Sequence, residues 1–540
     1  MAAGTGMATF WRWSLVKRLF NKVPALSSHL PLTLITIPTD ILHIILKLLK
    51  DSPNDGPHPR YDHEHCPGIH LFSLSGTCRY MRAQTLSWIF REGYNWRREG
   101  VTVWPASLWP FFVTLHIRDR SIRHPAHIPV LPEMFGALPM MPALTRVTLR
   151  LDAPIPAELL RALSLVPHLT ILEIHQARFD GTSPPPSLPF AALENLLICI
   201  SGFQGVKRGE NIDRAREIDN VFVLLKNLSD SLTKLQISGD FLGSSFLSLR
   251  WSRLQKFCIT EHTPTPYIPV PELVSGMPAV RDLSVLFSAD LTRDSADPYP
   301  PFRLGIPGGE LLTHRSPLLA TITLSNLEPT DPIFAQLPQS LESLHILAMQ
   351  DWYSLGPGSP QRLREAPFTA TTVVTAIQQI SHLEDLAELS LTLDDFATAD
   401  LIHRIAAVFP RLRFLQLGRS VYSHGRVFCP DVCDESIPDA LERLPHLTHL
   451  RISLDFVERQ FQEGPQESAA RWLFQRLPRL CTVAFSWQQW FYASGFPHVV
   501  WHFWDRSVLL RPPSRPPSPP SIFETRSLAG IPPWEQANSN

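Results

Sequence analysis

The sequence is short of charge and contains no long apolar run. Charged residues make up 18% of the 540 residues, and the formal net charge is −1. A chain so close to neutral has no global field to attract nucleic acid or an anionic membrane, so neither is expected as a partner. No apolar run reaches the roughly 18 residues of a membrane-spanning helix, so a transmembrane helix is not expected. The hydrophobic share of 44% is that of a globular protein.

Cysteine is scarce, and its pattern does not suggest disulfides. The seven cysteines are odd in number and scattered along the chain, so we expect reduced thiols and a location in the cytoplasm, the nucleus or both. The chain has no acidic residue before Asp40 and includes FWRWSLVKRLF at 10–20, a composition shared with some transit peptides. A disordered leader over residues 1–33 is the alternative that we favour.

Signatures of common enzymes and metal sites are also missing. The sequence has no G-x-S-x-G and no G-x-x-x-x-G-K-[ST] motif, so we expect no catalytic residue. One loop is rich in possible zinc ligands: His58, His63, His65, Cys66 and His70. Structural zinc sites usually supply two paired motifs, and here only one pair is visible, so we favour a solvated loop. Cys429 and Cys433 have no second pair nearby. We therefore expect no metal and no cofactor.

A repeated phrase is the strongest positive feature of the sequence. A proline followed by L-x-x-L-x-[LI] recurs clearly in VPHLTILEI (166–174), FPRLRFLQL (409–417), LPHLTHLRI (444–452) and LPRLCTVAF (477–485). Looser copies bring the total to about twelve units with a mean period of about 30 residues. Their first apolar positions are Leu144, Leu169, Leu193, Leu232, Leu254, Val280, Leu319, Leu341, Leu386, Leu412, Leu447 and Leu480.

Each unit predicts one short strand and an upstream helix. The final x-L-x-[LI]-x alternates with period two, as in a strand with one buried face. Amphipathic segments at 156–166, 399–409, 437–444 and 467–477 predict the clearest helices. The proline before each strand lacks an amide hydrogen and ends the helix. One such unit cannot bury its own apolar face, whereas stacked units share a core, which predicts an α/β solenoid with a parallel sheet. Separate α/β domains are the alternative.

The L-x-x-L-x-L phrase resembles that of leucine-rich repeat proteins, and the resemblance covers roughly residues 110–490. That family usually places Asn or Cys three positions after the last strand leucine. Here Asp152, Asp240, Asp394 and Asp455 stand at this position in four units, so the resemblance implies an irregular solenoid.

The open face of such a sheet is the expected binding surface. If the L-x-L residues face the core, the intervening residues face outward and are free to bind a protein target. We expect the target-binding residues to be Arg146, Arg150, His175, Lys234, Lys256, His449 and Arg451. Glu173, Asp282 and Glu388 share this face, and the mixed charge suits a protein rather than a phosphate backbone.

The segment IPTDILHIILKLL at 37–49 is apolar over most of a helical surface. A loop-like stretch at 51–70 separates it from a second helical pattern at 71–96. The inner face of the first helix should meet Leu71, Leu74 and Met81. A helical module of about 60 residues buries too little surface to be comfortable alone, so a partner is expected to cover the rest.

These segments resemble the F-box. The matching phrases are Ile37-Pro38-Thr39-Asp40-Ile41-Leu42 and Cys78-Arg79-Tyr80-Met81-Arg82, with an unusual insertion between the helices. The resemblance implies the substrate receptor of an SCF-type ubiquitin ligase, which docks on a Skp-family adaptor and through it on a cullin scaffold. The implied adaptor contacts are Ile37, Pro38, Ile41, Leu42, Ile45, Leu71, Leu74, Cys78 and Met81. The alternative is a leucine-rich repeat interaction scaffold without a ubiquitin role.

The expected organisation follows from these patterns. A leader (1–33) precedes the small all-α F-box-like module (34–97, with the inserted loop 51–70). The irregular leucine-rich repeat solenoid spans 110–506. Aromatic residues in WQQWFY (487–492) and VVWHFWD (499–505) suggest a C-terminal cap, although such residues also suit a binding surface. The Pro/Ser-rich stretch 511–540 cannot build a core and predicts a disordered tail, with a ligand for an SH3-type domain as the less favoured alternative.

Overall fold

The computed structural model describes residues 42–43, 45–47, 74–75, 79–96, 106–118, 132–151, 154–175, 178–181, 184, 187–199, 213–261, 264, 267–287, 304–309, 312–325, 327–347, 369–393, 397–419, 436–453, 463–491 and 496–510. The expected leader, the inserted loop 51–70 and the tail 511–540 lie outside the described residues. The chain divides into two compact units, Met1–Glu92 and Gly93–Asn540.

The described residues of the first unit are mostly helical and include an apolar core of their own. Residues 42–43, 45–47 and 74–75 are helical, and α4 spans Arg79–Ile89. The core consists of Leu42, Leu46, Met81 and Ile89, and the partly buried Ile45, Leu74, Tyr80, Trp88 and Phe90 pack against it. Leu42 and Leu46 share one face of the first helix because they are four residues apart. The first helix therefore meets Leu74 and Met81 as expected, while Leu71 lies outside the described residues.

The second unit is built on one open sheet. Among the described residues this sheet has 15 strands, ordered β1 to β15 as in the sequence. The strands are β1 (Glu92–Trp96), β2 (Thr114–Arg118), β3 (Arg146–Arg150), β4 (Ile171–His175), β5 (Asn195–Cys199), β6 (Lys234–Ser238), β7 (Lys256–Glu261), β8 (Asp282–Phe287), β9 (Thr321–Ser325), β10 (Ser343–Leu347), β11 (Glu388–Leu393), β12 (Phe414–Arg419), β13 (His449–Ile452), β14 (Thr482–Phe491) and β15 (Phe496–Asp505). Each pair from β2–β3 to β13–β14 is parallel.

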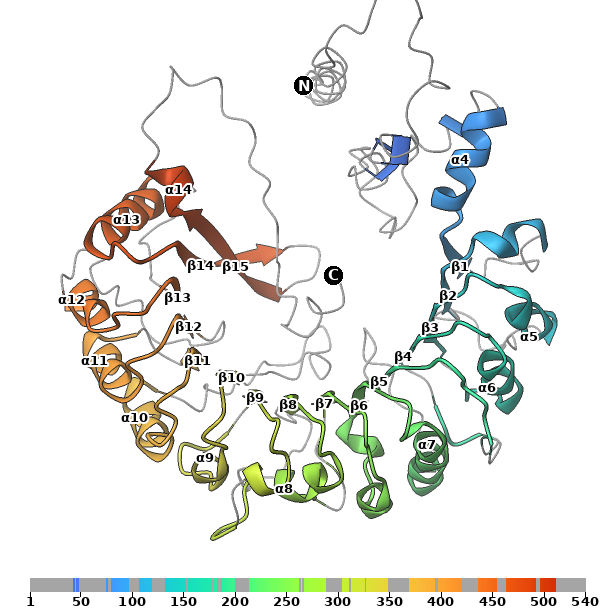
Figure 1. Cartoon of the computed structure of the whole chain (residues 1–540), viewed down its shortest axis with the longest axis horizontal. Helices are drawn as coiled ribbons and strands as arrows, with labels where there is room; N and C mark the ends of the chain where they lie inside the picture. The colour runs from blue at the N-terminus through green and yellow to red at the C-terminus, as the bar shows by residue number, and fades with distance from the viewer. Residues whose placement is uncertain are drawn as a thin grey trace, which may run out of the picture. The chain divides into compact units, whose positions relative to one another are not determined.

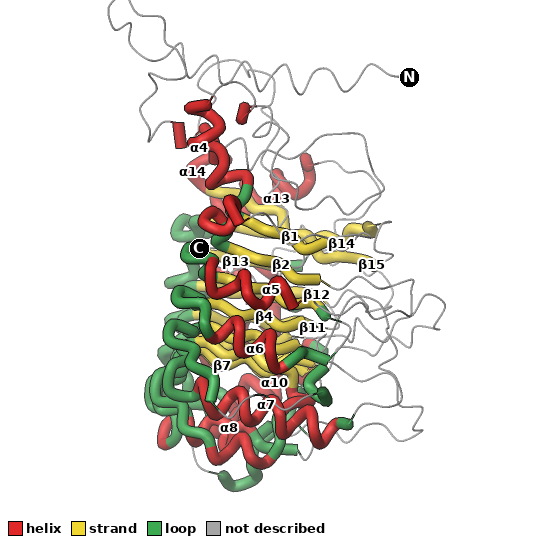
Figure 2. Tube along the Cα trace, turned by 90° about the vertical axis from the view of Figure 1, so that its right-hand side faces the viewer, coloured by secondary structure: helices red, strands yellow, loops and turns green. Residues whose placement is uncertain are grey.

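Helices connect successive strands and cover one face of the sheet. The α-helices of this unit are α5 (Pro132–Ala137), α6 (Ala157–Ser164), α7 (Arg214–Leu228), α8 (Val270–Leu273), α9 (Ile333–Gln336), α10 (Ala370–Gln379), α11 (Ala399–Val408), α12 (Ser436–Glu442), α13 (Glu463–Arg476) and α14 (Arg506–Leu509). Short 3-10 turns lie at Ala106–Phe111, Leu138–Met140, Gly239–Phe241, Ser244–Ser248, Val274–Gly276 and Leu312–His314. Within this unit the strands line the inner side of an arc and the helices its outer side (Figure 1), and the strands stack one upon the next (Figure 2).

The twelve repeated phrases coincide with twelve successive strands, β3 to β14. In every unit the first apolar position lies two residues before the strand and is buried, with at most 4% of its surface exposed. The following strand leucines stand in register from one unit to the next, as in the row Leu344, Leu389, Leu415, Leu450 and Val483. The α/β fold class, an irregular leucine-rich-repeat-like solenoid with a mostly parallel sheet, is therefore confirmed. The four clearest predicted helices correspond to α6, α11, α12 and α13.

A repeated backbone contact fixes the step between units. The carbonyl of the residue directly before a strand accepts two amide hydrogens of the next unit, from the residue directly before the next strand and from the first residue of that strand. The amides of Thr145 and Arg146 both donate to the carbonyl of Val113, and those of Cys481 and Thr482 both donate to the carbonyl of Thr448. Each of the twelve interfaces from β2–β3 to β13–β14 has such a pair of hydrogen bonds, with N···O distances of 2.7–3.2 Å. In four units a threonine directly after the first leucine adds its hydroxyl to the same carbonyl: Thr145, Thr170, Thr233 and Thr448. At these four positions a Leu-Thr pair in the sequence thus marks the contact.

The last strand departs from the repeat. β15 pairs antiparallel with β14 over the full range Thr482↔Asp505 to Phe491↔Phe496. Trp504 packs against the buried Phe485 with ring centroids 5.4 Å apart, whereas Phe503 on the opposite face is 45% exposed. The aromatic C-terminal segment therefore covers the edge of the last repeat strand and also contributes to the open face.

A close backbone approach makes Gly305 a sensitive position. The carboxylate of Asp331 accepts hydrogen bonds from the amides of Leu304, Gly305 and Ile333 at 2.7, 2.9 and 2.8 Å, which joins two connecting segments. A Cβ atom on Gly305 would lie 2.1 Å from the amide nitrogen of Ile333. We expect Gly305→Ala to lower the free energy of unfolding by about 3 kcal/mol, because backbone atoms must move to relieve the clash. Urea unfolding followed by circular dichroism measures this.

Gly136 supplies the matched control. It is exposed on α5, and an added Cβ would meet no atom within 4 Å. Gly136→Ala should raise the stability by roughly 0.5 kcal/mol through helix propensity. Equal unfolding midpoints for the two alanine variants would contradict the proposed role of the Gly305 contact.

Candidate functional site

The face of the sheet opposite to the helices carries the candidate site. Along each strand the side chains alternate, so that Val147 and Leu149 of β3 enter the core while Arg146, Thr148 and Arg150 face outward. All seven expected target-binding residues lie at such outward positions: Arg146, Arg150, His175, Lys234, Lys256, His449 and Arg451. The structure places them in two groups, one on β3–β7 and one on β13.

The first group contains a buried carboxylate held by neighbouring strands. Glu173 of β4 forms an ion pair with Arg146 and accepts a hydrogen bond from the Thr148 hydroxyl at 2.9 Å, and His175 Nε2 lies 4.0 Å from its Oε2. Burial alone would raise the pKa of Glu173. The neighbouring His175 and Arg146 side chains outweigh that effect and hold the pKa at about 2. Glu173 thus brings Arg146 and His175 together. Glu173 was expected on this face of the sheet, but not among the target-binding residues.

A shallow groove continues this cluster across the middle of the sheet. It has a volume of about 290 Å³ and is lined by outward residues of strands β3 to β10, among them Arg146, Lys234, Lys256, Asp282 and His345. Lys256 pairs with Asp282 at 3.2 Å. Burial lowers the pKa of His345, which favours the neutral imidazole. The charges of this groove are therefore largely balanced within it.

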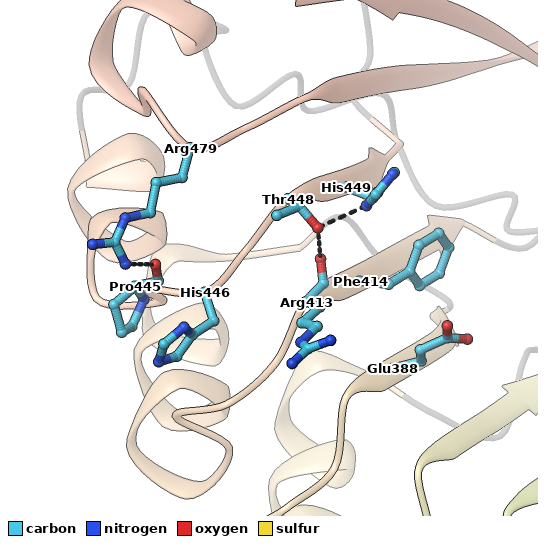
Figure 3. Close-up of a pocket in the computed structure, with 8 residues that line it drawn as sticks. All are labelled: Glu388, Arg413, Phe414, Pro445, His446, Thr448, His449 and Arg479. Carbon is cyan, nitrogen blue, oxygen red and sulfur yellow. Dashed lines mark hydrogen bonds between the residues drawn. The ribbon is translucent and has the colours of Figure 1, made fainter.

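A larger hollow lies at the other end of the repeat array (Figure 3). Its volume is about 740 Å³, and its lining residues are Glu388, Arg413, Phe414, Pro445, His446, Thr448, His449 and Arg479. Glu388, Phe414 and His449 begin strands β11, β12 and β13, and the other lining residues lie in the turns just before β12, β13 and β14. The hollow therefore follows the edge of the sheet at which the strands start. Thr448 joins two of them, since its hydroxyl bonds to the carbonyl of Arg413 at 3.1 Å and to Nδ1 of His449 at 2.7 Å.

Arg451 lies next to this hollow and between two aromatic rings. Its guanidinium carbon is 5.1 Å from the ring centroid of Phe414 on β12 and 5.1 Å from that of Phe503 on β15. It donates to the Gln416 side chain at 3.3 Å. Ala484 lies between Arg451 and Phe503 in the sheet, and its small side chain leaves room for the two to meet. Arg451 was predicted from the sequence, whereas Phe414, Phe503, Arg413 and Arg479 were not. Arg413 and Phe414 could have been found from their position at the start of a strand, and Phe503 from the aromatic segment 499–505.

The described residues include four of the implied adaptor contacts. Leu42 and Met81 are fully buried in the first unit, whereas Ile45 and Leu74 are partly exposed. Ile37, Pro38, Ile41, Leu71 and Cys78 lie outside the described residues. Their expected role in adaptor binding stays a prediction.

Nothing in the described part of the chain forms a metal-ligand group of three or more His, Cys, Asp or Glu side chains. The histidine-rich loop and the pair Cys429 and Cys433 lie outside it. Cys199, Cys258 and Cys481 are free thiols. Burial raises the pKa of the Cys199 and Cys258 thiols, so neither is activated as a nucleophile. No helix within the described ranges is long and apolar enough to span a membrane.

Comparisons with known proteins give only distant matches. No model of a protein family matches the sequence, and no curated protein matches it. Among solved structures, the leucine-rich repeat-containing protein LegL7 from Legionella pneumophila is similar at 12% identity and a TM-score of 0.33, over 65% of this chain and 97% of that one. The Rad7–Elc1 complex from yeast is similar at 13% identity and a TM-score of 0.30, over 89% of this chain and 93% of that one. The Toll–Spatzle complex from Drosophila is similar at 15% identity and a TM-score of 0.31, over 73% of this chain and 51% of that one. Scores this low carry no information about function.

The depressed pKa of Glu173 predicts a pH-dependent contribution to stability. Its side chain is only 12% exposed, so the ion pair with Arg146 is partly shielded from solvent. Near neutral pH, Glu173→Gln should lower the free energy of unfolding by about 2 kcal/mol. The contribution is complete above the ordinary pKa of 4.5 and is lost as the pH falls through about 2. The difference between the wild type and the variant should therefore shrink between these two values in urea titrations at successive pH.

Glu384→Gln is the control for this titration, because Glu384 is exposed on a turn and forms no ion pair with a described residue. It should leave the stability unchanged at every pH. If the difference in unfolding free energy between the wild type and Glu173→Gln stays constant down to a pH of about 2, the carboxylate charge is not its cause.

Proposed function

We propose that this protein is the non-catalytic substrate receptor of an SCF-type ubiquitin ligase. The observation that carries the proposal is the pair of F-box-like phrases, 37–42 and 78–82, in a small helical unit that precedes a leucine-rich-repeat-like solenoid. In this proposal the first unit docks on a Skp-family adaptor and through it on a cullin scaffold. The open face of the sheet recruits the target protein.

Partly buried apolar side chains in the first unit support docking. Ile45, Leu74 and three aromatic side chains lie around a described core of four buried apolar residues. Burial of their remaining apolar surface against a partner would add stability at roughly 25 cal/mol per Å². A partner with an apolar groove fits this requirement.

The sheet supports the recruitment of a protein. Its open face and the adjoining edge offer side chains of both charges, two hollows and exposed aromatic surface. Interfaces draw their affinity from such aromatic and arginine residues. A receptor of this kind needs no catalytic residue, since holding the target near the ubiquitin-carrying enzyme makes the transfer effectively intramolecular. Free thiols in the described residues suit the cytoplasm or the nucleus, where we place the protein.

Co-purification with a Skp-family adaptor tests the proposal. The full-length chain should co-purify with the adaptor and, when the cullin is added, with the cullin. Ile45 is partly exposed beside the core, so Ile45→Asp should weaken adaptor binding at least about tenfold, because an unpaired carboxylate enters an apolar contact. Leu42→Asp is not suitable, since Leu42 is fully buried and its loss would unfold the unit. Binding is measured by biolayer interferometry.

Lys47→Asp is the matched control because Lys47 is exposed two residues further along the same helix. It should retain adaptor binding, and the thermal melting of all variants should be compared. If the wild type fails to bind the adaptor, the chain is an interaction scaffold without a ubiquitin role and the proposal is wrong.

A further inference from the structure

We propose that the end of the open face formed by β11–β15 binds an acidic segment of a partner protein. The proposed contacts are Arg413, Arg451 and Arg479 for carboxylates, and Phe414 and Phe503 for the apolar part of the segment. We name these five residues the cationic end. The inference concerns what the solenoid binds and holds whether or not the first unit docks on an adaptor.

The charge at the cationic end is only partly offset, because Glu388 is the only carboxylate among the described lining residues of the hollow and acts on Arg451 through space. Among the described residues, no carboxylate forms an ion pair with Arg413, Arg451 or Arg479. Their polar partners are neutral: Gln416 for Arg451 and the carbonyl of Pro445 for Arg479. In the central groove, by contrast, Arg146 and Lys256 each have a carboxylate partner. An anionic ligand thus gains more at the cationic end, where no ion pair with an internal acid has to be broken.

Arg451 is held in place before any ligand arrives. The rings of Phe414 and Phe503 each lie 5.1 Å from its guanidinium carbon, which favours one position of a side chain that otherwise has many rotamers. A guanidinium has five N–H donors, and the contact with Gln416 uses one of them. The remaining donors can bind a carboxylate in a bidentate manner at little further entropic cost.

The adjoining hollow extends this site along the edge of the sheet. Phe414 both contacts Arg451 and lines the hollow of about 740 Å³, so the two features are continuous. Figure 3 shows Arg413 between His446 and Glu388, with Arg479 beyond Pro445. The spread of cations over three successive units suits an extended segment with several acidic side chains better than a single small anion.

The chemistry favours a protein over nucleic acid. Glu388 lies in the same hollow, where it would repel a continuous phosphate backbone, and the chain as a whole carries a formal charge of −1. A peptide with spaced acids can avoid Glu388 while it packs apolar side chains on Phe414 and on Phe503, which is 45% exposed. The mixture of arginine and aromatic residues is typical of protein interfaces.

Fluorescence anisotropy with a labelled peptide tests the proposal directly. The probe is an extended peptide with six glutamates interspersed with leucine and glycine, and its comparison peptide has glutamine at the six positions. The full-length protein should bind the glutamate peptide, lose affinity as salt is added, and bind the glutamine peptide at least about tenfold more weakly, which corresponds to 1.4 kcal/mol. A peptide with phosphoserine at the same positions shows whether carboxylate or phosphate is the preferred anion.

Two sets of variants separate this site from general charge attraction. Arg413→Gln/Arg479→Gln changes only exposed side chains and should keep the fold, and Arg451→Gln removes the stacked cation. Both should weaken binding of the glutamate peptide by about tenfold or more. Arg404→Gln on the outer helix α11, where Arg404 pairs with Asp400, is the matched control and should bind as the wild type does.

The proposal is overturned if the glutamate peptide does not bind, if the glutamine peptide binds equally well, or if Arg404→Gln weakens binding as much as the other variants. Equal binding of a single-stranded DNA oligonucleotide would also overturn it in favour of a general polyanion site. The assay contains no adaptor, so its outcome is independent of the ubiquitin ligase proposal.

Discussion

The second unit depends on one repeated contact, in which a single carbonyl accepts the first two amide hydrogens of the next repeat. This contact sets the register of every parallel strand pair from β2–β3 to β13–β14. A shift by one residue would turn the strand leucines outward and the polar residues inward, at a cost that grows with every unit. The buried first leucine of each repeat, such as Leu412 or Leu480, lies two residues before the strand and anchors the turn from which this register follows. The threonine hydroxyls at Thr145, Thr170, Thr233 and Thr448 reinforce it where they occur.

A fixed register aligns the outward residues of successive strands into rows, and the rows differ along the sheet. On β3–β8 the acids and bases meet as partners, as in Arg146 with Glu173 and Lys256 with Asp282. On β12–β15 the arginine side chain meets aromatic rings instead. The same scaffold therefore offers an electrically balanced middle and a cationic end. The difference follows from which residues stand opposite one another on neighbouring strands, since a charge is satisfied only by groups within a few ångströms.

The first unit has a different physical basis. Among its described residues, the buried apolar core consists of four side chains, and two of them, Leu42 and Met81, are residues that the F-box resemblance implies as adaptor contacts. A small core and an apolar first helix are what a module needs if it gains stability from its partner. This separates two roles in the proposed function: Leu42 and Met81 hold the shape of the docking face, and partly exposed neighbours such as Ile45 contact the adaptor.

The sequence by itself determined the repeat. Leucine spacing predicted the positions of β3 to β14, the helices that match α6, α11, α12 and α13, and the inward and outward faces of the strands. This was possible because burial of one face imposes that spacing directly. It did not determine the antiparallel strand β15, since a terminal hairpin has no repeat to reveal it. It also did not determine which outward residues meet. Arg146 and Glu173 are 27 positions apart in the sequence, and Arg451 on β13 meets Phe414 on β12 and Phe503 on β15. Only the tertiary register decides such pairs, because it alone sets the distance between side chains on different strands.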